Sequence, residues 1–204
     1  MKIESTLREA SKILKINKIP SYELDAQIIL SSIIGVSREF LVTNYKSDIS
    51  EEINQKYSKA IERRIKREPV AYITGEREFW SKNFLVDKST LVPRPETELL
   101  IYKVVSFFKN KTINILDIGT GSGCILLSIL KELKKSVGIG IDICPKAIKI
   151  AKKNSNRLNL NSRAKFRAID MTKFSIGKYD LVISNPPYIP SRDIKNLSKD
   201  IINY

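Results

Sequence analysis

Two segments of the chain carry residue types whose spacing could support group-transfer chemistry. The first, residues 117–123, has the sequence Asp-Ile-Gly-Thr-Gly-Ser-Gly and stands between an apolar stretch and a helical pattern. Glycines at such a junction let the backbone turn sharply and approach a ligand closely. The helix that follows directs its free N–H groups at an acceptor. The alternative interpretation is a tight strand-to-helix turn without a ligand.

The spacing of these glycines and the neighbouring acid indicate the kind of cofactor. Dinucleotide-binding loops follow G-x-G-x-x-G, whereas here the third glycine comes one residue earlier and Cys124 stands at the remaining position. The carboxylate of Asp117 would repel a pyrophosphate but attract the ammonium group of S-adenosyl-L-methionine (SAM). Residues 117–123 therefore predict a SAM site.

Acidic residues after the next two apolar stretches fit the same ligand. Asp142 ends the second stretch, where a carboxylate could accept hydrogen bonds from both ribose hydroxyls of an adenosine. Asp170 follows the third stretch, where an adenine would lie, and Met171 could pack on that ring. All three lie at carboxyl ends of predicted strands, where open α/β sheets bind ligands. Purely structural roles, such as a strand-end cap at Asp142, remain the alternative.

The second segment, Asn185-Pro186-Pro187-Tyr188, directly follows the fourth predicted strand. Pro186 keeps Asn185 extended, and neither proline has an N–H that would occupy a neighbouring carbonyl. The Asn185 side-chain oxygen and the Pro186 carbonyl are then two fixed acceptors for both N–H groups of a planar NH2, on which Tyr188 can stack. The segment predicts methyl transfer to such a nitrogen; an ordinary rigid turn is the alternative.

Alternating strands and helices must position the two segments. The patterns predict strands over residues 113–118, 137–141, 165–169 and 179–184, and helices over 97–108, 125–133 and 145–158. This alternation predicts a doubly wound parallel α/β sheet. Helices are expected over residues 1–70, a β-hairpin over 77–87 with its loop at 81–83, and a rigid connector at Pro93-Arg94-Pro95.

Composition excludes several classes of function. The 204 residues include no histidine and two cysteines, Cys124 and Cys144. A histidine-based triad is impossible, and no metal site is expected because zinc needs about four sulfur or imidazole ligands. No apolar run approaches a membrane span and no signal-peptide core is present, so we expect a cytoplasmic chain without membrane contact. The net charge of +14 favours either nucleic-acid attraction or a lysine-rich compositional bias.

With these motifs in place, the chain resembles the HemK family, the release-factor glutamine N5-methyltransferases. Residues 67–75, Arg-Glu-Pro-Val-Ala-Tyr-Ile-Thr-Gly, are similar to the family's interdomain segment, and residues 76–80, Glu-Arg-Glu-Phe-Trp, to its hairpin. Residues 91–98, Leu-Val-Pro-Arg-Pro-Glu-Thr-Glu, resemble a connector that other Asn-Pro-Pro-Tyr enzymes generally lack. The resemblance covers nearly the whole chain.

The resemblance implies a Rossmann-like SAM-dependent methyltransferase fold preceded by a small N-terminal helical domain and a β-hairpin linker. The implied domains are a release-factor-binding domain over residues 1–74, a linker over 75–95 and a methyltransferase domain over 96–204. The implied substrate is the glutamine of the Gly-Gly-Gln loop of peptide chain release factors. The expected cofactor-binding residues are Gly119, Thr120, Gly121, Ser122, Gly123, Asp142, Asp170, Met171 and Asn185; the expected catalytic residues are Asn185, Pro186 and Tyr188, and the expected substrate-binding residues Asn185, Pro186, Pro187 and Tyr188.

The family's sheet continues beyond the fourth strand, whereas the printed sequence ends at Tyr204. We therefore expect an incomplete sheet in a C-terminally truncated member, with an exposed apolar edge at Leu181-Val182-Ile183. Two alternative functions remain open. One is a nucleic-acid amino-methyltransferase of the adenine N6 type, because a flipped adenine also presents a planar NH2. The other is a truncated, non-catalytic remnant that only binds release factor.

Overall fold

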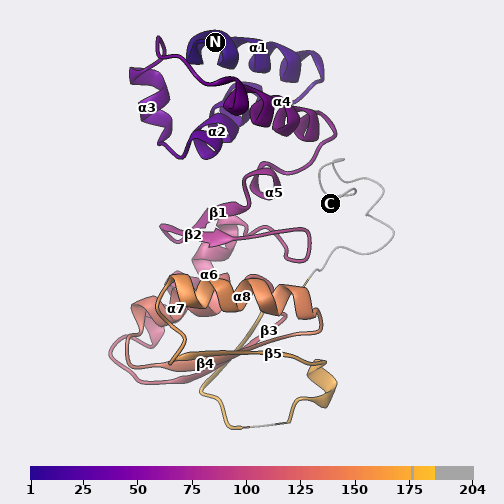
Figure 1. The fold of residues 1–204 in the computed structure, drawn as a ribbon. Coiled ribbons are helices and arrows are strands. Elements are labelled where there is room, and N and C mark those ends of the chain that lie inside the picture. Colours follow the sequence, from indigo (N-terminus) through magenta and orange to yellow (C-terminus); the bar gives the residue numbers. More distant parts are fainter. Residues whose placement is uncertain (176, 187–204) are drawn as a thin grey trace. The chain divides into compact units, whose positions relative to one another are not determined.

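The computed structural model describes residues 1–175 and 177–186, and the chain divides into two compact units. The first unit comprises Met1–Thr74 and the second begins at Gly75. Figure 1 labels most of the helices and strands of both units. None of the described helices combines the length and the apolar character that a membrane span requires.

The first unit consists of five helices around an aliphatic core. Leu14, Ile29 and Leu30 are completely buried in this core. The hydroxyl groups of Ser37 and Ser50 accept a backbone N–H from the first turn of α3 and α4, and so cap both helices. The helices are α1 (Ile3–Ile16), α2 (Tyr22–Ile34), α3 (Arg38–Thr43), α4 (Glu51–Ile65) and α5 (Val70–Thr74).

Helix α5 was not predicted from the sequence. The sequence patterns predicted helices only as far as residue 70, and residues 67–75 were noted for their resemblance to the family's interdomain segment. In the structure the Pro69 carbonyl accepts the N–H groups of Tyr72 at 2.9 Å and Ile73 at 3.1 Å. Proline suits the start of a helix because its missing N–H needs no partner there. The same residue therefore ends one helix and begins the next.

A buried ion pair joins α2 and α4 inside the first unit. Arg64 Nε donates to Asp25 Oδ2 at 2.7 Å, and both side chains are almost completely buried. Arg64 also donates to the Glu68 carbonyl at 3.1 Å, and the Tyr57 hydroxyl donates to the Ala26 carbonyl at 3.0 Å. Buried charges need such partners, because an unpaired charge in an apolar interior is strongly destabilising. These contacts fix the relative positions of α2 and α4.

A β-hairpin opens the second unit, but its turn begins one residue earlier than predicted and is one residue shorter. Strands β1 (Glu76–Phe79) and β2 (Lys82–Leu85) pair antiparallel, so Lys82 belongs to a strand and the loop is Trp80-Ser81. Both turn residues have positive φ, 51° and 54°. Such turns favour Asn-Gly pairs, so Trp-Ser carries no sequence signal for this turn. The Trp80 N–H donates to Glu98 Oε1 at 2.8 Å, which holds the strained corner.

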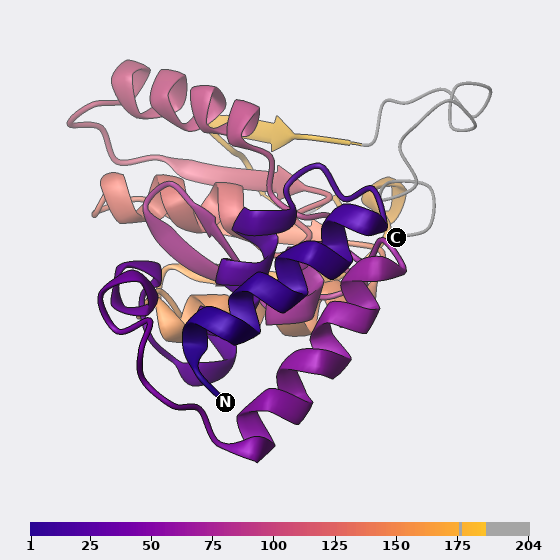
Figure 2. The same cartoon turned by 90° about the horizontal axis from the view of Figure 1, so that it is seen from above.

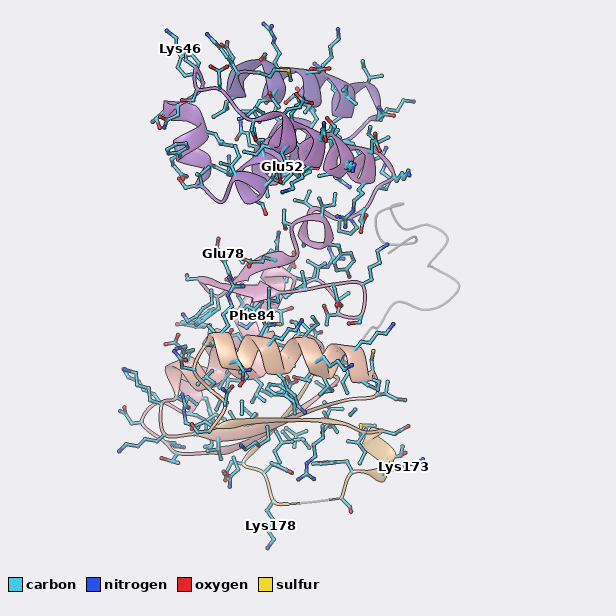
Figure 3. The ribbon with its side chains drawn as sticks, viewed as in Figure 1. Lys46, Glu52, Glu78, Phe84, Lys173 and Lys178 are labelled. Atoms are coloured by element: carbon cyan, nitrogen blue, oxygen red, sulfur yellow. The ribbon has the colours of Figure 1, made fainter. Side chains whose placement is uncertain are left out.

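The hairpin shares its hydrophobic core with the sheet that follows. Phe79 and Phe84 are buried in edge-to-face contact, with ring centroids 6.2 Å apart. They belong to the same apolar cluster as Leu126, Leu127 and Leu130 of α7. Figure 3 shows Phe84 directed into the interior of this unit. The hairpin is therefore part of the packed second unit.

The second unit is built on a four-stranded parallel sheet with strand order β5-β4-β3-β6. This order confirms the predicted parallel α/β class. Helices α7 and α8 lie on the same side of the sheet (Figure 1). The strands are β3 (Asn114–Ile118), β4 (Val137–Asp142), β5 (Ala164–Ala168) and β6 (Leu181–Ser184); the helices are α6 (Glu98–Phe107), α7 (Cys124–Glu132) and α8 (Pro145–Arg157), with 3-10 turns η1 (Pro95–Thr97) and η2 (Met171–Lys173).

Strand β6 forms one edge of the described sheet (Figure 2). The apolar edge expected at residues 181–183 is only partly exposed: Val182 is 56% exposed, Leu181 is half-buried and Ile183 is buried. Successive side chains in a strand point to opposite faces, so Ile183 joins the core while Val182 faces away from it. The expectation was therefore right for Val182 and wrong for Ile183.

Candidate functional site

The glycine-rich loop connects the buried end of β3 to the first turn of α7. Gly119, Gly121 and Gly123 have φ of 72°, 55° and 79°, a region that side chains strongly disfavour. The N–H groups of Gly119 and Thr120 both donate to the Ile141 carbonyl at 2.9 Å, which ties the loop to β4. The three glycines therefore permit one fixed turn at the carboxyl end of the sheet.

Asp117 supports this loop from beneath. Its side chain is only 1% exposed, and its Oδ2 accepts the Thr120 hydroxyl at 2.6 Å. Burial raises the pKa of Asp117 to about 6, and the charge of Asp142 also raises it, while hydrogen bonds from Thr120 and from the Leu126 N–H lower it. From its position before the loop, this carboxylate was expected to attract the ligand's ammonium group. The structure shows instead a buried group that holds the loop and the first turn of α7.

Asp142 ends β4 and also fixes the loop. Its Oδ2 accepts the Gly121 N–H and its Oδ1 accepts the Cys144 N–H, both at 2.9 Å. Each carboxylate oxygen can accept more than one hydrogen bond, and the side chain is only half-buried. Asp142 thus orients the loop backbone and keeps acceptor capacity for hydroxyl groups of a ligand.

The residues of the loop differ in what they present to a ligand. The side chains of Thr120 and Ser122 are buried, whereas Gly119 is exposed and Gly121 is half-buried. A ligand on the open side of the loop would therefore meet backbone atoms and Asp142 rather than the two hydroxyl groups. The sequence could not distinguish these orientations.

Asn154 of α8 is a buried residue of this region that the sequence argument missed. Its Nδ2 donates to the Ser122 carbonyl at 2.8 Å and to the Leu85 carbonyl at 3.0 Å, and its Oδ1 accepts the Leu85 N–H at 2.8 Å. The side chain thereby joins the glycine-rich loop to strand β2. The sequence did contain a signal for this residue, because Asn154 is a polar residue on the same helical face as Ala147 and Ala151, which are buried.

The segment after β5 approaches the Asp142 end of β4. The Ile169 N–H donates to the Asp142 carbonyl at 2.9 Å. Asp170 Oδ1 accepts the Thr172 N–H and hydroxyl, both at 2.8 Å, and these bonds lower the pKa of Asp170. Met171 is 56% exposed. Asp170 thus shapes the turn, and Met171 offers an exposed apolar surface beside it.

Asn185 and Pro186 follow β6, the strand that pairs directly with β3. The register sets Ser184 opposite Ile118, and the Ser184 hydroxyl donates to the Ile118 carbonyl at 3.1 Å. Asn185 and Gly119 therefore both lie at the carboxyl ends of their strands, which are neighbours in the sheet. The Asn185 Nδ2 donates to Thr97 Oγ1 at 3.4 Å. Pro187 and Tyr188 lie outside the described residues.

These segments meet where ligands bind in open α/β sheets, at the carboxyl ends of neighbouring parallel strands. The Asp142 carboxylate and the backbone of the loop form a site beside a helix N-terminus, and Asp142 keeps free acceptor capacity there. Carboxylates fit a cationic ligand that carries ribose hydroxyls and do not fit a pyrophosphate. This combination of carboxylate acceptors and backbone groups agrees with SAM as the ligand.

A parallel sheet with this glycine loop and an Asn-Pro segment at the adjacent strand end defines a methyltransferase domain, and the comparisons agree. The family described as "Methyltransferase domain" matches residues 109–201, and the one described as "PrmC N-terminal domain" matches residues 5–75. The chain is 36% identical to a release factor glutamine methyltransferase of Bradyrhizobium diazoefficiens, over 98% of this chain and 68% of the relative. The chain therefore belongs to the release factor glutamine methyltransferase family.

Further relatives carry the same name. Identity is 38% to the protein of Clostridium acetobutylicum, over 100% of this chain and 73% of the relative. It is 39% to that of Buchnera aphidicola subsp. Schizaphis graminum, over 98% of this chain and 72% of the relative. Among solved structures, a SAM-dependent methyltransferase from Thiobacillus denitrificans in complex with S-adenosyl-L-homocysteine is 25% identical, with a TM-score of 0.38 over 45% of this chain and 36% of that chain.

Proposed function

We propose that the chain transfers the methyl group of SAM to the side-chain amide nitrogen of the glutamine in the Gly-Gly-Gln loop of peptide chain release factors. The pairing of β6 with β3 carries this proposal, because it brings Asn185 to the strand end from which the glycine-rich loop begins. The names of the relatives specify the substrate class, a glutamine of a release factor.

Two acceptors are proposed to hold the substrate nitrogen. The Asn185 side-chain oxygen and the Pro186 carbonyl would each accept one N–H of the glutamine amide. An amide nitrogen is a poor nucleophile because its lone pair is delocalised, and hydrogen bonds at both N–H groups return electron density to it. Fixed alignment of reactants can lower a barrier by roughly 7–11 kcal/mol. SAM supplies an electrophilic methyl group when bound, and the nitrogen's proton leaves after transfer.

The proposed cofactor contacts follow the geometry of the strand ends. The backbone of residues 119–123 would line the methionine part of SAM beside the N-terminus of α7. Asp142 would accept ribose hydroxyls with the lone pairs left free by Gly121 and Cys144. Met171 would pack on the adenine, with Asp170 holding its turn. Pro187 and Tyr188 complete the proposed substrate site by family resemblance.

The first unit is proposed to bind the release factor. A hollow of about 430 Å³ there is lined by apolar side chains together with one acid and one amide, namely Leu7, Leu41, Val42, Tyr45, Glu4 and Gln27. Val42 is 65% exposed, and Phe40 nearby is also exposed. Such surface is typical of protein contacts. A release-factor substrate would place the reaction in the cytoplasm, where translation terminates.

A methyl-transfer assay tests the proposal. The chain is incubated with SAM labelled in its methyl group and either a release factor or the same factor with the loop glutamine replaced by alanine. The expected result is label on the glutamine-containing peptide of the intact factor and none on the variant. An adenine-containing oligonucleotide serves as the competing substrate. Label on the oligonucleotide, or on the alanine variant to the same extent as on the intact factor, would contradict the proposal.

A further inference from the structure

We propose that Thr97 is a positioning residue that orients the side-chain amide of Asn185, so that its oxygen and not its NH2 faces the substrate nitrogen. The inference rests on the proposed function and assigns a role to the connector at residues 91–98. Its basis is the contact between Asn185 Nδ2 and Thr97 Oγ1 at 3.4 Å, which joins residues 88 positions apart in the chain.

The local backbone leaves the Thr97 hydroxyl available for this contact. Thr97 stands immediately before α6, where a threonine hydroxyl commonly accepts an N–H of the first turn. Here Thr97 has helical dihedrals, φ −69° and ψ −18°, because it is the last residue of the 3-10 turn η1 and its N–H donates to the Arg94 carbonyl at 3.0 Å. Among the residues that the structure describes, its hydroxyl caps no helix N–H.

The orientation of the Asn185 amide decides whether the substrate nitrogen can be held in its reactive position. The oxygen and the NH2 of an asparagine have nearly the same shape, so a half-turn of the amide exchanges an acceptor for a donor. A donor facing the substrate NH2 would leave both groups without a partner. When Thr97 Oγ1 accepts the Asn185 Nδ2–H, the Asn185 Oδ1 points the other way. Thr97 therefore selects the productive orientation.

The position of Thr97 is itself fixed by contacts on both sides. Pro95 stands at the start of η1 and restricts its backbone. Glu98, the next residue, accepts the Trp80 N–H at 2.8 Å, and the Trp80 indole N–H donates to Glu132 Oε1 of α7 at 2.9 Å. The connector is thus attached to the hairpin turn and to α7, the helix that begins at the glycine-rich loop. Such support allows one hydroxyl to define an orientation.

Three variants separate positioning from packing. Thr97→Val keeps the shape and removes the hydroxyl, Thr97→Ser keeps the hydroxyl, and Thr112→Val is the control at an exposed threonine of the same unit. For Thr97→Val we expect kcat about 3- to 10-fold lower, the effect of one hydrogen bond of about 0.7–1.4 kcal/mol. The KM for release factor and the dissociation constant for SAM should stay within about twofold, since neither depends on one weak bond. Thr97→Ser and Thr112→Val should retain the wild-type kcat.

A double-mutant cycle tests whether Thr97 acts through Asn185. In an Asn185→Ala background the amide to be oriented is gone, so Thr97→Val should lower kcat no further. An equal loss from Thr97→Val in both backgrounds would overturn the inference, as would a wild-type kcat in the Thr97→Val chain. A merely structural role for Thr97 would lower the unfolding temperature in both backgrounds alike.

A nuclear magnetic resonance measurement keeps the inference separate from the proposed function. With asparagine labelled by nitrogen-15, the two side-chain N–H signals of Asn185 are those that disappear in Asn185→Ala. They should shift in Thr97→Val and stay in place in Thr97→Ser and Thr112→Val. Unshifted signals in Thr97→Val would overturn the inference whether or not the chain methylates a release factor. A chain that shows the shift but transfers no methyl group would refute the proposed function alone.

Discussion

Replacing Asn154 by alanine tests whether one buried side chain couples the glycine-rich loop to the hairpin. Asn154 is 1% exposed and makes three hydrogen bonds of 2.8–3.0 Å with backbone groups of Leu85 and Ser122. Alanine removes all three and leaves the backbone groups without their partners. We expect loss of stability in the second unit together with weaker binding of SAM.

The magnitude follows from how deeply each backbone group is buried. Ser122 is 2% exposed, so its unpaired carbonyl should cost about 1–3 kcal/mol. Leu85 is half-buried, and water can reach its groups in part, so each of its two lost bonds should cost about 0.5–1 kcal/mol. The sum is about 2–5 kcal/mol, which lowers the unfolding temperature of a chain of this size by about 5–15 °C.

The assay uses the single tryptophan of the chain. Trp80 lies in the hairpin turn of the second unit, so its fluorescence during urea denaturation reports on the unit that contains Asn154. Calorimetric titration with SAM measures the cofactor site in parallel. Asn156→Ala is the matched control, because Asn156 is exposed on the same helix. Free energies of unfolding that agree within about 0.5 kcal/mol for both variants would refute the reasoning, since surface substitutions stay in that range.

Three further predictions concern buried charge and close packing. Burial raises the pKa of Asp117 from 3.8 to about 6, so between these pH values the folded chain holds a proton that the unfolded chain releases. The free energy of unfolding should therefore fall by about 3 kcal/mol as pH rises from about 4 to 6. Asp117→Asn should abolish this fall in urea titrations. In Gly140→Ala the new Cβ would lie 2.7 Å from Thr120 Oγ1 in the glycine-rich loop. Calorimetric titration should then show weaker SAM binding, and thermal melting should show a loss of about 1–3 kcal/mol in the free energy of unfolding. Unchanged values would contradict the geometry. Asp25→Asn removes the negative charge from the buried ion pair with Arg64. This variant should lose about 3–5 kcal/mol of stability by circular dichroism, whereas a cost near zero would mean that water reaches the pair.

The order of the elements followed from the sequence because periodicity and glycine placement are local signals. Residues 113–118 were predicted as a strand and residues 145–158 as a helix, and β3 and α8 occupy nearly those positions. The pairing of β6 beside β3 brings the strand end before Asn185 next to the strand end from which the glycine-rich loop begins. Motifs at strand ends can be located in this way because parallel strands present all their carboxyl ends on one side.

Features that depend on tertiary contacts escaped the sequence argument. The hairpin turn at Trp80-Ser81 exists because Glu98 accepts the Trp80 N–H across 18 residues of chain, and no local preference records that. Asp117 was expected to face a ligand, but its partners are Thr120 and the first turn of α7. Glu98 lies on another element, and the burial of Asp117 depends on how α7 packs on the sheet, so composition and spacing could identify neither.

The rate of methyl transfer by Asn185→Ala tests the central claim most directly, the claim that a fixed acceptor at Asn185 holds the substrate nitrogen. Removing one positioned hydrogen-bonding group should raise the barrier by about 2–4 kcal/mol, by analogy with oxyanion-hole donors. We therefore predict that kcat with release factor falls by a factor of about 30 to 1,000, while the dissociation constant for SAM changes far less. Turnover by Asn185→Ala close to that of the wild-type chain would contradict the account.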